Sequence, residues 1–349
     1  MGTKDARKAF LNVLSALNVD TSKLFINITD GGSSSMEIMM LGVSGPSSKS
    51  PIMLLDPSYT NYIQFAQRLN IPIVTVERTM NKDGSFEKLN FKRIIWMIEK
   101  YKPSAFVVIP YDNPTGQFIN QKTLCKIAEI CVKTGTWLVS DEAYRPLVYG
   151  EQEESSIWKI SLEDLPGIHS YRISIESASK VWNGCGLRIG GIITDNEEFH
   201  KKAISEYTAN LCANTIGQNI FGTLAYESHD NIKKWYLTQI KYYERLFNLL
   251  KTGFDKEFPG LIISKPESSI YCILDFRNIC TDKFDTEIFI DFCATKGAVK
   301  INQNLYTILL APMNGFYKLS KYAKTQLRLS LVESPDLLKI TPKILYSLF

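Results

Sequence analysis

The chain of 349 residues is long enough for one large domain and a second, smaller one. Its net charge is only +4, and it has no dense Lys/Arg run, which argues against a nucleic-acid-binding protein. Seven scattered cysteines and only three histidines argue against a zinc site, so we expect no metal and a cytoplasmic protein with reduced thiols. The polar start predicts no signal peptide, and no apolar run is long enough to cross a bilayer.

Short apolar runs alternate with amphipathic stretches along the chain. We predict helices at 6–17, 91–101 and 121–134, and strands at 52–55, 71–76, 106–109, 137–140, 171–175 and 189–194. This alternation indicates an α/β fold with a largely parallel sheet covered by helices on both faces. Ligands of such sheets bind at the carboxyl ends of the strands.

A long helical stretch at about 231–258 marks a change of pattern. Beyond it we predict strands at 270–276 and 326–332 and a helix at 284–296, which together indicate a smaller α+β domain. The expected divisions are an N-terminal remnant at 1–20, a large domain at 21–240 and a small domain at 241–349.

The segment between the last two strands of the predicted large sheet contains the most informative residues. It reads Ser177-Ala-Ser-Lys180, followed by Gly186-Leu-Arg188-Ile-Gly190. A lysine at the carboxyl end of a strand can form an imine with an aldehyde cofactor. The Ser177 hydroxyl and the Arg188 guanidinium could both bind a phosphate. Taken alone, the segment fits an ordinary surface loop with a solvated lysine better.

Two further segments follow predicted strands. Asn113 precedes Pro114 in a turn sequence, and its amide can donate a hydrogen bond to an oxyanion. Asp141 ends an apolar strand, where its carboxylate needs a partner such as a protonated pyridine nitrogen. Tyr144 could donate to the same oxyanion as Asn113. The simpler alternative is a helix N-cap at Asp141 with Tyr144 packed beside it.

Two segments nearer the N-terminus are weaker signals. Gly31, Gly32 and Ser33 open into an apolar helical pattern, and backbone N–H groups at such a helix start bind phosphate. For this segment alone, a capped turn is the better interpretation. Tyr59 follows a strand and could lie flat on a heteroaromatic ring, or could be an exposed loop residue.

Taken together and in this order, the segments resemble the class I/II aminotransferases, which are pyridoxal 5′-phosphate (PLP) enzymes of fold type I. The segment Gln326-Leu-Arg328-Leu-Ser330 is similar to the strand of that family that carries a carboxylate-binding arginine. The resemblance runs from about Asp5 to the C-terminus. It implies a large domain with a mostly parallel mixed sheet, a smaller α+β C-terminal domain, and a homodimer that acts on amino acids and 2-oxo acids.

The resemblance also implies roles for the residues around the cofactor ring. Lys180 would hold the cofactor aldehyde as an internal aldimine and then carry the proton between substrate and cofactor. Asp141 would keep the pyridine nitrogen protonated, and Tyr59 would stack on the ring. Asn113 and Tyr144 would hydrogen-bond the phenolic oxygen, and Asn113 would also help to bind the substrate.

The remaining implied roles concern charged groups of the ligands. Gly32, Ser33, Ser177 and Arg188 would bind the phosphate, and Arg328 would bind the α-carboxylate of the substrate. Some aspartate-specific members carry a lysine where this chain has Ser33, so a preference for dicarboxylates is not supported. Members also usually have a longer N-terminal segment, and without it we expect a more open pocket and weaker PLP binding.

Other functions remain possible on the sequence alone. A PLP lyase or decarboxylase shares the fold and the first steps, and an N-terminally truncated, catalytically impaired homologue would keep the same residues. A nicotinamide oxidoreductase is excluded because the glycines at 184, 186 and 190 precede a predicted strand instead of following one.

Overall fold

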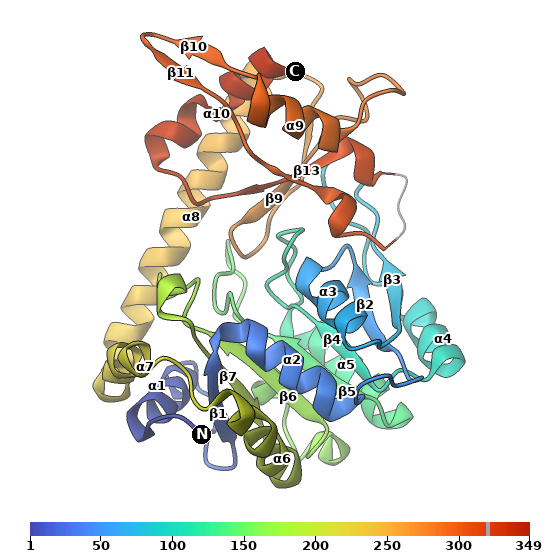
Figure 1. Cartoon of the computed structure of the whole chain (residues 1–349), viewed down its shortest axis with the longest axis vertical. Helices are drawn as coiled ribbons and strands as arrows, with labels where there is room; N and C mark the ends of the chain where they lie inside the picture. Colours follow the sequence, from blue (N-terminus) through green and yellow to red (C-terminus); the bar gives the residue numbers. More distant parts are fainter. Residues whose placement is uncertain (319–321) are drawn as a thin grey trace.

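Seven strands form one mixed sheet in the order β1-β7-β6-β5-β4-β2-β3 (Figure 1). The computed structural model describes residues 1–318 and 322–349. Strands β2 to β6 are parallel, and β7 is antiparallel to both of its neighbours, β6 and β1. The carboxyl ends of all strands except β7 therefore meet at one edge. The strands are β1 Phe25–Asp30, β2 Ile52–Asp56, β3 Ile73–Glu77, β4 Ala105–Val108, β5 Trp137–Asp141, β6 Arg172–Ser177 and β7 Ile189–Thr194.

Helices cover both faces of this sheet because side chains of its strands are apolar on both sides. In β2, Ile52 and Leu54 belong to one apolar cluster, whereas Met53 and Leu55 belong to another. The first cluster includes side chains of α2 Gly31–Val43, α3 Thr60–Arg68 and α6 Glu197–Tyr207. The second includes side chains of α1 Lys4–Ser15, α4 Phe91–Tyr101, α5 Gln121–Thr134 and α7 Thr215–Gly222.

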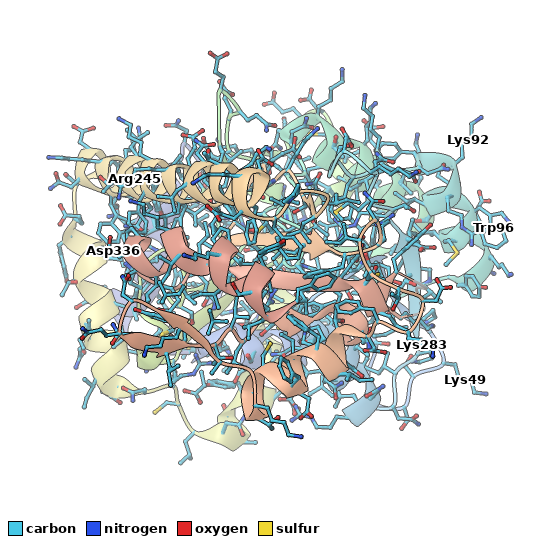
Figure 2. The ribbon with its side chains drawn as sticks, turned by 90° about the horizontal axis from the view of Figure 1, so that it is seen from above. Lys49, Lys92, Trp96, Arg245, Lys283 and Asp336 are labelled. Carbon is cyan, nitrogen blue, oxygen red and sulfur yellow. The ribbon has the colours of Figure 1, made fainter. Side chains whose placement is uncertain are left out.

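Helix α4 illustrates why these helices form and how they pack. The Asn90 side chain caps it by accepting from the Arg93 N–H at 3.0 Å. Ile94, Met97 and Ile98 recur at helical spacing and are buried against the sheet. On the opposite face, Lys92 and Trp96 point outward from the molecule (Figure 2).

The long helix α8, His229–Glu257, connects the large sheet to the C-terminal part of the chain (Figure 1). There a four-stranded sheet has the order β12-β13-β9-β8. Its strands are β8 Ile262–Ile263, β9 Tyr271–Asp275, β12 Ala311–Pro312 and β13 Gln326–Ser330. This part of the chain also contains a hairpin of β10 Val299–Ile301 and β11 Asn304–Tyr306. Its two helices are α9 Thr286–Thr295 and α10 Pro335–Leu348. This is the smaller α+β part that the sequence predicts. The domain boundaries at 20/21 and 240/241 remain predictions.

One strand of the large sheet is absent from the sequence prediction. Strand β1 has no continuous apolar run because Asn27 and Thr29 occupy buried positions within it. Strand β3 begins at Ile73, two residues later than predicted, and β6 extends to Ser177. None of the helices among the described residues is both long and apolar enough to span a membrane.

Candidate active site

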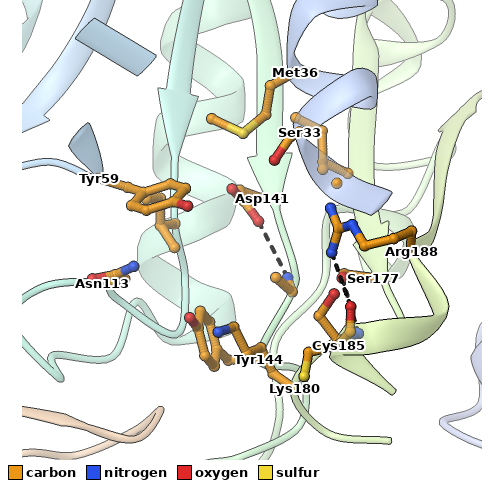
Figure 3. A pocket seen from close by; sticks show the side chains of 15 residues that line it. Ser33, Met36, Tyr59, Asn113, Asp141, Tyr144, Ser177, Lys180, Cys185 and Arg188 are labelled. Carbon is orange, nitrogen blue, oxygen red and sulfur yellow. Dashed lines mark hydrogen bonds between the residues drawn. The ribbon is translucent and has the colours of Figure 1, made fainter. Parts of the chain in front are cut away.

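A cavity of about 230 Å³ lies at the edge where the carboxyl ends of the strands meet (Figure 3). All nine residues that the sequence assigns to the cofactor line it, namely Gly32, Ser33, Tyr59, Asn113, Asp141, Tyr144, Ser177, Lys180 and Arg188. The structure therefore brings together segments separated by more than 150 positions. Their individual roles remain to be tested. The sequence did not predict the other lining residues, which are Met36, Ile109, Ala143, Ile175, Ser179 and Cys185.

Lys180 lies in the tight loop that follows β6. The loop is closed by a hydrogen bond from the Gly184 N–H to the Ala178 carbonyl at 3.0 Å, and the Asn183 N–H donates to the Lys180 carbonyl at 3.1 Å. The side chain is half-buried and borders the cavity. Within the described residues, its Nζ takes part in no hydrogen bond or ion pair, so the amine is available to a ligand.

Asp141 is the buried carboxylate of the cavity. The Tyr62 hydroxyl donates to its Oδ2 at 2.9 Å and the Ala143 N–H donates to its Oδ1 at 3.2 Å, the bond drawn in Figure 3. Burial raises the pKa of Asp141 to about 6 although both hydrogen bonds lower it. No cation of the described residues forms an ion pair with it. A positively charged ligand group would therefore be stabilised here.

Tyr62 is a site residue that the sequence did not reveal. It lies on α3, one helical turn after Tyr59, and is completely buried. Its spacing from Tyr59 was the only available signal, because the contact with Asp141 joins residues 79 positions apart.

Arg328 and Asn113 meet at the border of the cavity. Nη1 of Arg328 donates to Oδ1 of Asn113 at 2.8 Å. This bond uses the amide oxygen, so the amide nitrogen of Asn113 remains free to donate to a ligand. The peptide bond between Asn113 and Pro114 is cis. Arg328 itself lines a neighbouring hollow of about 600 Å³ beside β13 and α10, not the cavity.

Tyr144 also lines the cavity, and its hydroxyl lies 2.5 Å from the hydroxyl of Tyr271 on β9. Burial raises the pKa of Tyr144 well above its usual value, so this hydroxyl keeps its proton at neutral pH. Residues 143–146 after β5 form turns instead of a helix, so the alternative of a helix N-cap at Asp141 is wrong.

The end of the cavity beside α2 fits an anion. Helix α2 begins at Gly31, and no side chain caps its first turn, which leaves backbone N–H groups at Gly32 and Ser33 for a ligand. Gly190 permits this arrangement, because a Cβ there would lie 2.4 Å from the Gly31 carbonyl carbon. Arg188 lies against the same turn, and a Cβ on Gly31 would lie 2.4 Å from its Nη2.

These groups match the cofactor that the sequence resemblance implies. The anion site suits a phosphate, the uncompensated Asp141 suits a pyridinium nitrogen, and the free amine of Lys180 suits an aldehyde. Among the described residues, no cluster of three or more His, Cys, Asp or Glu side chains could hold a metal ion.

Comparison with known proteins gives an independent result. The family model described as "Aminotransferase class I and II" matches residues 25–339. The "Probable aspartate/prephenate aminotransferase" of Aquifex aeolicus is 27% identical over 203 residues, which cover 58% of this chain and 49% of that protein. The "Cystathionine beta-lyase PatB" of Bacillus subtilis is 24% identical over 227 residues, covering 64% and 56%. The matched region thus spans about half of each of these relatives.

The fold agrees with the same family. N-succinyldiaminopimelate aminotransferase from Mycobacterium tuberculosis superposes with a TM-score of 0.82 at 19% identity, covering 100% of this chain and 84% of that one. At this identity the similarity establishes the fold, which is the predicted PLP fold type I.

Proposed function

The chain belongs to the class I and II aminotransferase family, whose enzymes depend on PLP, and we propose that it is itself a PLP-dependent aminotransferase. The proposed reaction moves an amino group between an amino acid and a 2-oxo acid. The observation that carries the proposal is that three groups border one cavity: the Lys180 amine, a buried carboxylate without a cationic partner among the described residues, and an anion site at the start of α2. When bound, PLP supplies an electrophilic aldehyde carbon and a ring that accepts electrons from the substrate's α-carbon.

Each of the nine residues assigned to the cofactor has a defined task in this proposal. Lys180 would hold the cofactor through its aldehyde carbon, with loss of water, and its amine would then move the proton at the substrate's α-carbon. Asp141 holds the proton on the pyridine nitrogen, and Tyr59 packs on the ring. Asn113 and Tyr144 donate hydrogen bonds to the phenolic oxygen.

The phosphate is bound by backbone N–H groups of Gly32 and Ser33 and by the side chains of Ser33, Ser177 and Arg188.

Arg328 is the proposed binding residue for the substrate's α-carboxylate. Its planar guanidinium can bind a carboxylate through two parallel hydrogen bonds. It reaches the cavity border through Asn113, and Asn113 assists in binding the substrate. A hollow of about 480 Å³ shares Ser179, Lys180 and Cys185 with the cavity and provides space next to the reactive amine.

The direct test is to incubate the PLP-loaded protein with a panel of single amino acids. A transaminase converts the cofactor to pyridoxamine phosphate and releases one oxo acid per site. The same preparation should then regenerate PLP when a 2-oxo acid is added. Absence of both half-reactions for every amino acid would contradict the proposal.

A lyase is the second candidate because the B. subtilis relative is named as one. Elimination would expel the substituent on the β-carbon of the amino acid and, after hydrolysis, release ammonia and an oxo acid continuously, without accumulation of pyridoxamine phosphate. A catalytically impaired homologue would bind PLP but show neither reaction. The same incubation therefore separates all three functions.

Dimerisation and location are also proposals. Leu211, Ile216, Ile220 and Tyr226, in and around α7, are 52–85% exposed, an apolar surface that a second copy of the chain would cover. Sedimentation velocity should show a dimer, and Ile216→Lys should weaken it.

We also propose a cytoplasmic location, which the seven free cysteines support, and we propose no nucleic-acid partner.

A further inference from the structure

Tyr271 lies between two groups to which the proposed function gives separate tasks. Its hydroxyl lies 2.5 Å from that of Tyr144, and its ring lies under the guanidinium of Arg328, with the guanidinium carbon 4.4 Å from the ring centroid. It is 4% exposed and is not one of the residues that line the cavity. Any effect of Tyr271 on the ligands would thus act through Tyr144 and Arg328.

The β-sheet fixes this arrangement. In the pairing of β9 with β13, Tyr271 is opposite Ser330 and Arg328 is opposite Ile273. Tyr271 and Arg328 are therefore diagonal neighbours on the same face of the sheet. Phe316 also lies against the guanidinium, with its ring centroid 4.7 Å from the guanidinium carbon. The two aromatic rings hold Arg328 in one orientation, with Nη1 on Asn113.

The hydroxyl pair has a preferred direction. Each hydroxyl has one proton, so only one of the two can donate in this bond. The positive charge over the Tyr271 ring draws electron density from its hydroxyl, which makes that hydroxyl the better donor and the poorer acceptor. When Tyr271 donates, Tyr144 accepts, and the proton of Tyr144 can then point into the cavity.

We propose that Tyr271 is a positioning residue that directs the Tyr144 hydroxyl proton into the cavity and holds the Arg328 guanidinium in place. The hydroxyl performs the first task and the ring performs the second. This inference rests on the proposed function, in which Tyr144 donates to the cofactor and Arg328 binds the substrate.

Two substitutions separate the two tasks. Tyr271→Phe keeps the ring but removes the hydroxyl, so it should shift the pH midpoint of the visible absorption of bound PLP. It should also lower kcat about two- to tenfold and leave KM for amino acids unchanged. Tyr271→Leu removes the ring as well, so KM should rise about tenfold in addition.

A matched control variant, and the same substitution made in a Tyr144→Phe variant, show whether Tyr271 shifts the absorption midpoint through Tyr144. Tyr317→Phe removes another buried hydroxyl, which donates to Oε1 of Gln326 at 2.9 Å away from the cavity. It should leave the absorption midpoint unchanged. In a Tyr144→Phe background, adding Tyr271→Phe should cause no further shift of that midpoint.

The same coupling should be measurable without cofactor. In the cofactor-free chain, the shifts in unfolding midpoint caused by Tyr144→Phe and Tyr271→Phe should be non-additive, because both remove the same hydrogen bond. Additive shifts would overturn the proposal, and so would an unchanged absorption midpoint in Tyr271→Phe or an undiminished shift in the Tyr144→Phe background. Failure of the unsubstituted chain to bind PLP would instead refute the proposed function, and the unfolding cycle would still test the pair.

Discussion

Two adjacent carboxylates at the end of β5, Asp141 and Glu142, are surrounded very differently. Asp141 borders the cavity, and among the described residues it accepts hydrogen bonds only from neutral groups. Glu142 forms an ion pair with Arg145, whose Nη2 also binds Oε2 of Glu176 at 2.8 Å. All of these groups are buried. In the Arg145 network the chain supplies the positive charge itself, whereas at Asp141 that position is left for a ligand.

The difference shows which buried charges serve the fold and which serve a ligand. Oε1 of Glu142 also accepts from the Ser140 hydroxyl at 2.9 Å and the Ile157 N–H at 3.1 Å. A network with its own cation and several hydrogen bonds is stable without a ligand. A buried carboxylate without a cation reduces the stability of the ligand-free protein, and this is typical of functional sites.

Asp141→Asn tests the cavity side of this comparison and should have the largest effect. An amide cannot hold the proton on the pyridine nitrogen, so kcat should fall about 10²–10³-fold while the protein stays folded. Steady-state transamination and circular dichroism would measure the two properties. Near-normal turnover would show that Asp141 does not contact the cofactor.

The pH dependence of stability should separate the same variant from the original chain. The pKa of Asp141 in the folded protein, about 6, lies above the value of 3.8 that is usual for an aspartate. The protonated Asp141 carboxyl therefore contributes fully to the free energy of unfolding below about pH 4. This contribution, roughly 3 kcal/mol in total, is lost as the pH rises through 6. Asp141→Asn should remove this loss.

Urea unfolding of the two cofactor-free proteins at about pH 4 and about pH 8 measures that loss directly. Burial also raises the pKa of Asp56 to about 6, but Asp56 is present in both proteins and cancels in the difference. Equal pH dependence of unfolding in the two proteins would show that burial does not raise the pKa of Asp141.

Glu142→Gln tests the other side of the comparison. Removing one carboxylate from the buried network should lower the free energy of unfolding by about 2–3 kcal/mol, because Arg145 loses one of its two partners. Turnover per folded molecule should change little. A loss of kcat like that of Asp141→Asn, at full stability, would mean that the two carboxylates do not have distinct roles.

Of the three substitutions, Arg328→Lys should cause the smallest loss of free energy, and it should affect substrate binding. An ammonium cannot reproduce two parallel hydrogen bonds to a carboxylate, so KM for amino acids should rise about 10–100-fold while PLP remains bound. Equilibrium dialysis of PLP provides the control. Release of the cofactor would place Arg328 in the cofactor site or in the core.

Much of this site was predictable because several functional segments follow apolar strands. Asp141 ends β5 and Lys180 follows β6, and strand ends of a parallel sheet converge. Arg328 was identified only through the family resemblance, because nothing in its predicted strand indicates a carboxylate-binding role. The boundaries of α4 and α5 also agree with their predicted ranges.

The partners of these residues were not predictable. Tyr62 reaches Asp141 from 79 positions away, and Tyr271 reaches Tyr144 from 127 positions away. Nothing in their local sequence distinguishes them from core tyrosines. Likewise, the sequence gives no sign that the neighbouring Glu142 forms an ion pair within the chain, because this depends on the Arg145 side chain and on the packing of β6.

The central claim is that the cavity binds PLP through Lys180. Borohydride reduction of the PLP-loaded protein makes the covalent link to a lysine permanent, and peptide mapping then identifies that lysine. We predict a single labelled position, Lys180, and no label in Lys180→Ala. A label on another lysine, or an equal label in Lys180→Ala, would contradict the account.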